Sequence, residues 1–281
     1  MAEIASAPVT EPLPRPRDAH PGFSPFNRCN HSPWVIASAE FNHASPVIRL
    51  AGVREGNRRL FAVLDKTPDA GRRAEIFNEY MSVKFHLHEW RTYEAAARRS
   101  LRNNYLRFLQ GWALDSNSVE GAVLKGWVES RIGLAPTFHR GRLRARHSEE
   151  NLAYAADRVR GAARTSAIDS QLDLVYEFCQ YEIRRRFGPE PFVLYRGTFD
   201  REDYPVLGRH GKRRHRVLLN SLVSFTRDRE RAWEFGSTVW RARVAPAKVF
   251  HFAGLLPDSI LRGEEEVIVL GGEFDVEELL F

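Results

Sequence analysis

Residues 262–274 read RGEEEVIVLGGEF, so that three glutamates stand directly before an apolar run. The run, 267–270, is mostly β-branched and is bounded by glycines, which is typical of a short buried strand. Like charges crowded at the mouth of such a strand repel one another, and at least one carboxyl pKa rises unless a cation or a hydrogen-bond donor compensates. The stretch therefore predicts a β region here. The clustering of three carboxylates at its start requires a separate explanation.

Outward from this stretch, the chain after Gly188 is predicted to consist of strands joined by short turns. β-branched and aromatic residues are bounded there by turn residues, as in small antiparallel domains. A single helix, over 227–236, interrupts them. The predicted strands cover 191–197, 216–226, 237–244, 248–252, 265–272 and 273–281.

Before Gly188 the pattern is helical. Phe77, Met81 and Phe85 follow one another at the spacing of a helix face. Gly188 is a natural helix stop, because glycine readily adopts the left-handed conformation that ends a helix. The three arginines at 184–186 are favourably placed near the negative end of the helix dipole. The predicted helices cover 72–90, 118–132 and 168–188. The fold class is therefore α+β, with a helical N-terminal part followed by a mostly antiparallel β core.

Composition indicates a globular protein. Hydrophobic residues make up 43% of the 281 residues and charged residues 28%, which is ordinary for a soluble chain. No apolar run approaches the ~20 residues of a membrane span, and the first residues lack the basic-then-apolar pattern of a signal peptide. Cys29 and Cys179 do not make a disulfide framework. We expect a cytoplasmic protein with no membrane span.

Two basic runs, 139–147 and 208–216, accompany a net charge of +6. Gly and polar residues around both runs predict loops with solvated charge. A surface for nucleic acid needs aromatic residues interleaved with the basic ones, and these runs contain almost none. A basic nucleic-acid-binding module is therefore the less favoured of the possible functions.

The familiar phosphate and metal motifs are absent from the sequence. It has no glycine-rich dinucleotide loop, no G-x-x-x-x-G-K-[ST], no H-E-x-x-H and no G-x-S-x-G. The pairs His86–His88 and Cys29–His31 each offer two ligands without a second pair to complete a site. We predict no metal centre.

Strand geometry predicts which of the three glutamates lie on the same face. Side chains alternate between the faces of a strand, so Glu264 and Glu266 share one face if the strand extends back to 264, and Glu265 points the other way. Two carboxylates in one space are tolerated where a substrate brings positive charge or where two carboxylate roles are needed. The alternative is a solvated acidic turn before an edge strand, which the spacing alone favours.

Two other strand ends carry polar groups. Arg196, followed by Gly197, ends an apolar strand, where a guanidinium either snorkels to water or waits to bind phosphate with its planar fork. Ser224 and Thr226 end the next strand on one face, with Phe225 on the other. Each element alone is common, but the ordered set of aromatic-Arg-Gly, Ser-aromatic-Thr and Glu-x-Glu is not.

That ordered set resembles the arginine-specific mono-ADP-ribosyltransferases of the R-S-E class. The resemblance implies that NAD is the substrate and that Arg196 orients its phosphates, while Ser224 and Thr226 support the site. It implies that Glu266 drives catalysis and that Glu264 selects arginine as the acceptor. The implied catalytic residues are Glu266, Glu264 and Ser224, and the implied cofactor-binding residues are Arg196, Gly197, Thr226 and Phe225.

The neighbouring aromatic residues are assigned by burial alone. Phe225 and Phe235 pack either near nicotinamide or in the core, and for Phe235 the core is favoured. Tyr195 and Trp233 are expected in the core, where most large aromatic side chains lie.

The helical half is similar to the dinitrogenase reductase ADP-ribosyltransferases of nitrogen-fixing bacteria. The similar stretches are 27–42, 50–61, 80–90 and 101–134. This implies transfer of ADP-ribose to one arginine of the nitrogenase iron protein, reversible arrest of nitrogen fixation, and regulation by a PII signalling protein. The Pro- and Ala-rich start predicts a disordered tail (1–25), and we expect a helical recognition or support region (26–165) followed by an NAD-binding catalytic domain (166–281).

A different NAD-consuming enzyme is the main alternative, either a glycohydrolase or a transferase acting on another macromolecule. Glu264 argues against it, because hydrolysis needs no guanidinium partner.

Overall fold

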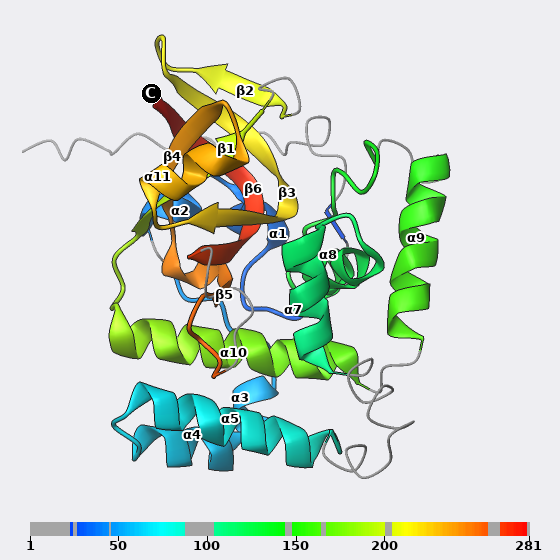
Figure 1. Ribbon diagram of the computed structural model, residues 1–281, viewed down its shortest axis with the longest axis vertical. Coiled ribbons are helices and arrows are strands. Elements are labelled where there is room, and N and C mark those ends of the chain that lie inside the picture. The colour runs from blue at the N-terminus through cyan, green and yellow to red at the C-terminus, as the bar shows by residue number, and fades with distance from the viewer. Residues whose placement is uncertain are drawn as a thin grey trace, which may run out of the picture.

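The computed structural model describes residues 23–24, 27–44, 46–87, 104–143, 148–163, 167–199, 204–257 and 265–279. A helical part, first in the chain, packs against an antiparallel sheet that follows it (Figure 1). The predicted α+β class is therefore confirmed. Within the described residues, no helix has both the length and the apolar character needed to cross a membrane.

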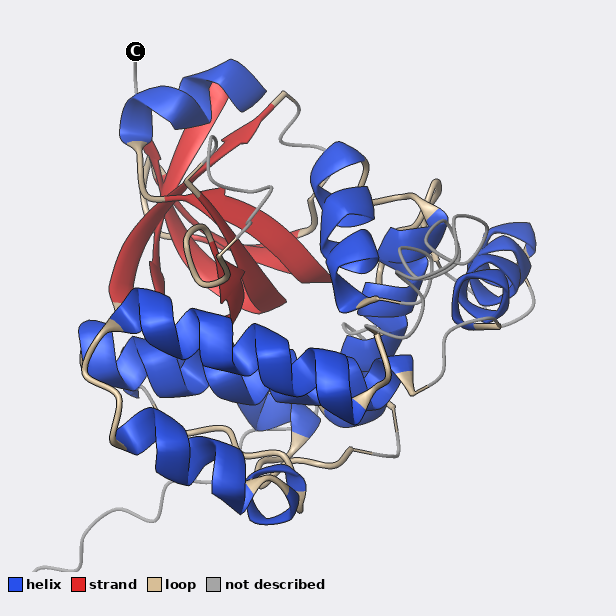
Figure 2. Cartoon of the chain, turned by 60° about the horizontal axis from the view of Figure 1, so that its bottom comes forward, coloured by secondary structure: helices blue, strands red, loops and turns tan. Residues whose placement is uncertain are grey.

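The helical part is organised around one long helix. The helices are α1 (Pro33–Ala37), α2 (Phe41–Ala44), α3 (Val53–Gly56), α4 (Arg58–Asp65), α5 (Ala70–Lys84), α7 (Tyr105–Leu114), α8 (Val119–Arg131), α9 (Glu149–Ala162) and α10 (Ile168–Arg186). Helix α10 lies between the sheet on one side and α4 and α5 on the other, while α7, α8 and α9 stand beside the sheet (Figures 1 and 2). Its position between two layers explains why α10 is buried along most of its length.

The three predicted helices form where the sequence placed them. Ser118 caps α8 by accepting a hydrogen bond from the Gly121 amide, and α10 ends two residues before Gly188. Helix α5 begins at Ala70, because Asp69 caps it, and ends at Lys84 rather than at 90. Positions 88–90 lie outside the described residues.

Six strands make up the sheet. They are β1 (Phe192–Thr198), β2 (Val206–Arg209), β3 (Arg214–Thr226), β4 (Thr238–Val244), β5 (Val249–Phe252) and β6 (Glu266–Leu279). The strand order is β2-β3-β1-β4-β6-β5, and β3 also pairs with β6. Strands β3, β1, β4 and β6 therefore pair in a closed ring, and every pairing is antiparallel.

The predicted strands 265–272 and 273–281 are one continuous strand, β6, so the predicted break between them is wrong. Two glycines allow the chain to continue. A Cβ at Gly271 would lie 1.6 Å from the carbonyl oxygen of Asn220, and Gly272 has a φ of +104°. The register between β3 and β6 shifts opposite them, which marks a bulge rather than a turn.

Two other local predictions are corrected. The predicted helix 227–236 is split into α11 (Arg229–Ala232) and a 3-10 turn, η2 (Trp233–Phe235). The basic run 208–216 is a loop only over 210–213, because its two flanks belong to β2 and β3, which pair as a hairpin. Carboxylates of β6 support the extended chain there: Asp275 accepts two hydrogen bonds from the Arg216 guanidinium.

The other basic run, 139–147, is described as far as residue 143. The residues 138–142 form a turn closed by a bridge between Phe138 and Arg142. His139 is fully buried and lies 3.2 Å from the Asp157 carboxylate, so it is not the solvated loop residue that was predicted.

The larger of two hydrophobic clusters contains residues of both the helical part and the sheet. The indole of Trp127 on α8 packs on Phe250 of β5, with ring centroids 4.9 Å apart. From α10, the Tyr176 hydroxyl donates to the Ala247 carbonyl, and Gln180 donates to the carbonyl of Val249. The helical part is therefore fixed to the sheet close to the strand ends that carry polar residues.

Candidate active site

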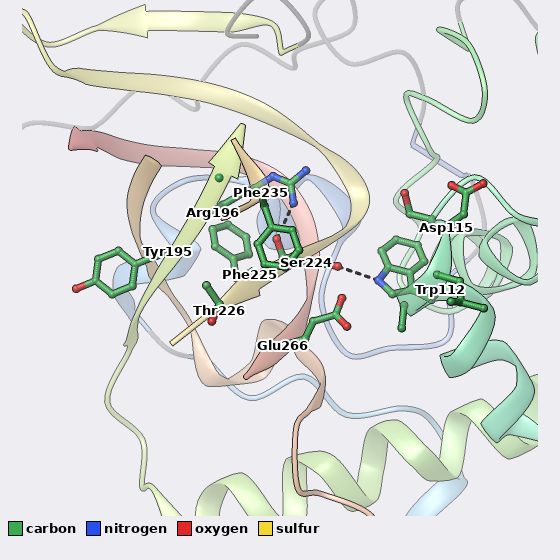
Figure 3. A pocket seen from close by; sticks show the side chains of 13 residues that line it. Trp112, Asp115, Tyr195, Arg196, Ser224, Phe225, Thr226, Phe235 and Glu266 are labelled. Atoms are coloured by element: carbon green, nitrogen blue, oxygen red, sulfur yellow. Dashed lines mark hydrogen bonds between the residues drawn. The ribbon is translucent and has the colours of Figure 1, made fainter. Parts of the chain in front are cut away.

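A cavity of about 270 Å³ opens where the ends of β1 and β3 and the start of β6 meet the end of α7 (Figure 3). It is lined by Trp112, Ala113, Leu114, Asp115, Ser116, Tyr195, Arg196, Gly197, Ser224, Phe225, Thr226, Phe235 and Glu266. Six of the seven residues predicted for the site line this cavity. The seventh, Glu264, lies outside the described residues.

Strand pairing explains why distant residues meet here. Tyr195 of β1 pairs with Thr226 of β3, and Thr226 pairs with Glu266 of β6. In antiparallel neighbours the end of one strand lies beside the start of the next. The three predicted elements are therefore brought to one edge of the strand ring.

Arg196 is held by neutral partners. It donates from Nη1 to the carbonyl oxygen of Ser224 over 2.6 Å and from Nη2 to the hydroxyl of Tyr204 over 2.7 Å. Its guanidinium carbon lies 5.6 Å from the centre of the Tyr204 ring. No ion pair among the described residues involves Arg196, and its buried Nε has no hydrogen-bond partner within that part of the chain. The group can therefore receive an anion from the cavity side.

Ser224 joins the two halves of the molecule. Its Oγ accepts a hydrogen bond from the indole Nε1 of Trp112 on α7 over 2.9 Å, while its carbonyl accepts from Arg196. One residue of β3 thus contacts both the basic side of the cavity and the helical wall.

Glu266 is the first residue of β6 and is only 7% exposed. Glu265 before it is exposed and has a φ of +49°, which is left-handed and not strand-like. The alternation of faces assumed for the three glutamates therefore does not extend back through Glu265. The position fits the solvated surface charge predicted for Glu265.

The aromatic residues of the cavity differ from their predicted places. Phe225 is buried against Phe274 and also lines the cavity, while its contact with nicotinamide stays a prediction. Phe235 is 45% exposed and lines the cavity, so its predicted core position is wrong. Tyr195 and Trp233 are half-buried rather than in the core.

Gly197 explains the position of Phe235. A Cβ at Gly197 would lie 2.1 Å from the carbonyl oxygen of Ala232 and 2.9 Å from the carbonyl carbon of Phe235. Only a glycine lets the α11–η2 segment rest directly on β1. Phe235, at the end of this segment, then lies at the cavity with its side chain partly exposed.

A family model described as dinitrogenase reductase ADP-ribosyltransferase matches residues 26–278. This chain belongs to the dinitrogenase reductase ADP-ribosyltransferase family. It is also 42% identical, over 246 residues, to the NAD(+)--dinitrogen-reductase ADP-D-ribosyltransferase of Rhodospirillum rubrum, an alignment that covers 85% of this chain and 89% of the relative. No solved structure matches the chain.

The match to the dinitrogenase reductase ADP-ribosyltransferase family includes the helical half, and that half supplies cavity residues that the sequence did not reveal. Trp112 and the segment 113–116 form one wall, and Tyr204 holds the predicted arginine. The sequence offers one indication of a role for Trp112. Its indole lies at the end of an apolar helix face, where a buried N–H needs a hydrogen-bond partner. Within the described residues, no group of three or more His, Cys, Asp or Glu side chains gathers as a metal site would.

Proposed function

We propose that this protein transfers ADP-ribose from NAD to an arginine side chain of dinitrogenase reductase and so switches nitrogen fixation off reversibly. The observation that carries the proposal is the meeting of Arg196, Ser224 and Glu266 in one cavity, in a chain of this family. The name of the Rhodospirillum rubrum relative gives both the NAD donor and the protein acceptor.

Binding of NAD is assigned to the β1–β3 side of the cavity. The Arg196 guanidinium is a planar fork that suits the oxygens of a pyrophosphate, and only two of its five N–H groups donate to partners described in the structure. Phe225 and Phe235 offer ring surface to the nicotinamide. No glycine-rich helix start is needed, because the arginine supplies the positive charge.

Cleavage of NAD is assigned to Glu266. When the bond between ribose C1′ and the nicotinamide nitrogen breaks, its electron pair leaves with nicotinamide and positive charge develops on the sugar. A buried carboxylate beside the ribose stabilises that charge more than it stabilises the ground state, and this difference lowers the barrier. The low exposure of Glu266 strengthens the effect, since little water screens it.

Acceptance by arginine is assigned to Glu264. A guanidinium is protonated at neutral pH and is a poor nucleophile. A nearby carboxylate can orient it and take one proton while a guanidinium nitrogen bonds to C1′. In this proposal Glu266 serves the cationic sugar and Glu264 the cationic acceptor, and these two roles would explain why the chain tolerates neighbouring carboxylates.

Two further assignments complete the proposal. The chain is taken to work in the cytoplasm, a reducing compartment, because Cys29 and Cys179 are both free thiols. The regulator is taken to be a PII signalling protein, as the resemblance of the helical half implies.

The test uses the purified protein, NAD labelled in its adenosine moiety, and purified dinitrogenase reductase. Label should appear on one arginine of the reductase, located by mass spectrometry, with nicotinamide released in equal amount. Release of free ADP-ribose without labelled protein would instead identify a glycohydrolase. When a soluble extract of a nitrogen-fixing bacterium replaces the purified reductase, a label on other macromolecules but not on the reductase would identify a transferase of different specificity.

A further inference from the structure

The hydrogen bond from Trp112 to Ser224 joins residues 112 positions apart and lies at the wall of the cavity. Trp112 is 3% exposed, so little water competes for its N–H. Its partner Ser224 belongs to the predicted catalytic set, whereas Trp112 comes from the helical half. A hydrogen bond from the indole can influence how the serine hydroxyl is oriented.

The hydrogen-bonding capacity of a serine hydroxyl limits that orientation. A hydroxyl has one proton to donate and two lone pairs that accept, whereas an indole N–H only donates. Trp112 therefore occupies an acceptor position of Ser224 Oγ, and the hydroxyl proton must be donated in another direction. Figure 3 shows the Glu266 carboxylate on the same side of the cavity as Ser224 Oγ. A carboxylate can only accept, so it suits the free proton.

Helix α7 holds Trp112 firmly enough for such a role. The Tyr105 amide at its start donates to the Gln171 side chain of α10 over 3.0 Å. At its other end, a Cβ at Gly111 would lie 2.4 Å from Glu120 Cβ, so α7 and α8 are in close contact. These contacts fix the backbone of α7 that carries the indole, and the indole itself is buried.

The bond is not what attaches the helical half to β3. The Thr137 amide donates to Asn220 Oδ1 over 2.9 Å, and Asn220 donates back to the Phe138 carbonyl over 2.9 Å. Loss of the Trp112 bond leaves these contacts in place. Its effect is therefore expected on the chemistry more than on the fold.

We infer that Trp112 is a positioning residue: by donating to Ser224 it directs the serine proton to the Glu266 carboxylate and keeps that carboxylate ionised and correctly turned. The inference rests on the proposed function, because it needs Glu266 to act on NAD. Trp112 itself touches no reacting atom in this account.

The first experiment removes only the N–H. Trp112→Phe keeps an aromatic ring, and replacement of Trp112 by its benzothienyl analogue, with sulfur in place of the N–H, keeps the full shape. Both should lower kcat roughly tenfold, the scale of one lost hydrogen bond, with the KM for NAD changed less than about twofold. The acid limb of the pH–rate profile should move to higher pH, because a carboxylate that loses a donor is protonated more easily.

A matched control comes from the same half. Trp127 is also buried and donates its Nε1 to Asp173 over 2.8 Å, but it does not line the cavity. Trp127→Phe should lower the melting temperature and leave kcat and the pH profile unchanged. An equal loss of kcat in both variants would make the Trp112 bond merely structural and overturn the inference.

A double-mutant cycle tests the route through Ser224. If Trp112 acts only through the serine, Trp112→Phe should have no further effect on kcat in a Ser224→Ala background. Additive losses, or a benzothienyl variant as fast as the wild type, would overturn the inference. Each rate is measured both as transfer and as NAD hydrolysis. A wild-type protein with neither activity would overturn the proposed function, whereas an active wild type with an indifferent Trp112 would overturn this inference alone.

Discussion

The Arg196 guanidinium donates a hydrogen bond to the backbone carbonyl of Ser224 over 2.6 Å, which fastens the end of β1 to the end of β3. The side-chain hydroxyl of the same serine accepts a hydrogen bond from the indole N–H of Trp112. The basic wall, the serine and the helical wall of the cavity therefore form one connected unit, with Glu266 beside it on β6. Substitution of any of these residues is expected to affect NAD binding or turnover more than it affects the stability of the fold.

Arg196→Lys is expected to weaken NAD binding. Lysine keeps the charge but lacks the planar fork and cannot hold both Ser224 and a pyrophosphate. The Kd for NAD, measured by calorimetry, should rise roughly tenfold or more, the scale of one lost charge-assisted hydrogen bond. Arg241→Lys is the control, because Arg241 pairs with Glu277 on an exposed face away from the cavity. An unchanged Kd for Arg196→Lys would leave Arg196 as a side chain that only snorkels.

Glu264→Gln is expected to separate the two half-reactions. A glutamine can still hydrogen-bond but cannot take the proton of the attacking guanidinium. Transfer to arginine should fall by orders of magnitude while slow NAD hydrolysis persists, both followed as nicotinamide release with and without acceptor. Equal loss of both activities would place Glu264 in the NAD-cleaving step.

Recognition of the protein target is expected to involve surfaces outside the cavity. Leu114 is 89% exposed at the cavity rim, and Lys212 and Arg213 are exposed in the β2–β3 hairpin. A folded target needs such docking area to deliver its arginine. Leu114→Ser and the charge reversals Lys212→Glu and Arg213→Glu should weaken modification of dinitrogenase reductase.

The same variants should modify a small guanidino compound at nearly the wild-type rate, provided that circular dichroism shows them folded. Exposed charge reversals on the helical half are expected to behave likewise. A parallel loss with both acceptors would mean that these surfaces support the active site and do not dock the target.

The buried Lys248 is expected to make stability depend on pH. Burial lowers the pKa of its ammonium to about 7, against the smaller opposing effect of Glu273. Above pH 7 the unfolded chain therefore binds a proton that the folded chain does not, and the free energy of unfolding rises with pH. Between pH 7.5 and 9, this residue should contribute a slope of about 1.4 kcal/mol per pH unit.

Lys248→Met should remove that slope, since methionine fits between the rings of Phe41 and Phe274 without a titrating group. Urea titrations at several pH values give the comparison. Parallel pH profiles of the wild type and the variant would show that Lys248 stays charged in the folded protein.

The sequence predicted the sheet side of the site because polar residues at strand ends stand out against apolar runs. Arg196, Ser224 and Glu266 could be found in this way, and antiparallel pairing then brings them together. Trp112 could not, because nothing local shows that an indole on a distant helix will face β3.

Local patterns also misjudged several elements whose form depends on tertiary contacts. The basic hairpin is held extended by carboxylates on β6, which a local reading of charge does not include. The two glycines in β6 suggested a turn, but Gly271 accommodates the close approach of Asn220 and Gly272 that of Ala37. Phe235 was expected in the core because it is hydrophobic. Its segment instead rests on β1 at Gly197, and its side chain lines the cavity.

The central claim is that Glu266 stabilises the transition state and does not hold NAD in the ground state. The most direct measurement compares Glu266→Gln with Glu265→Gln, its exposed neighbour. Transfer of ADP-ribose to dinitrogenase reductase and the Kd for NAD are measured for both. The account predicts that Glu266→Gln lowers kcat by orders of magnitude with little change in Kd, and that Glu265→Gln changes neither. Transfer at a near-normal rate by Glu266→Gln would contradict it.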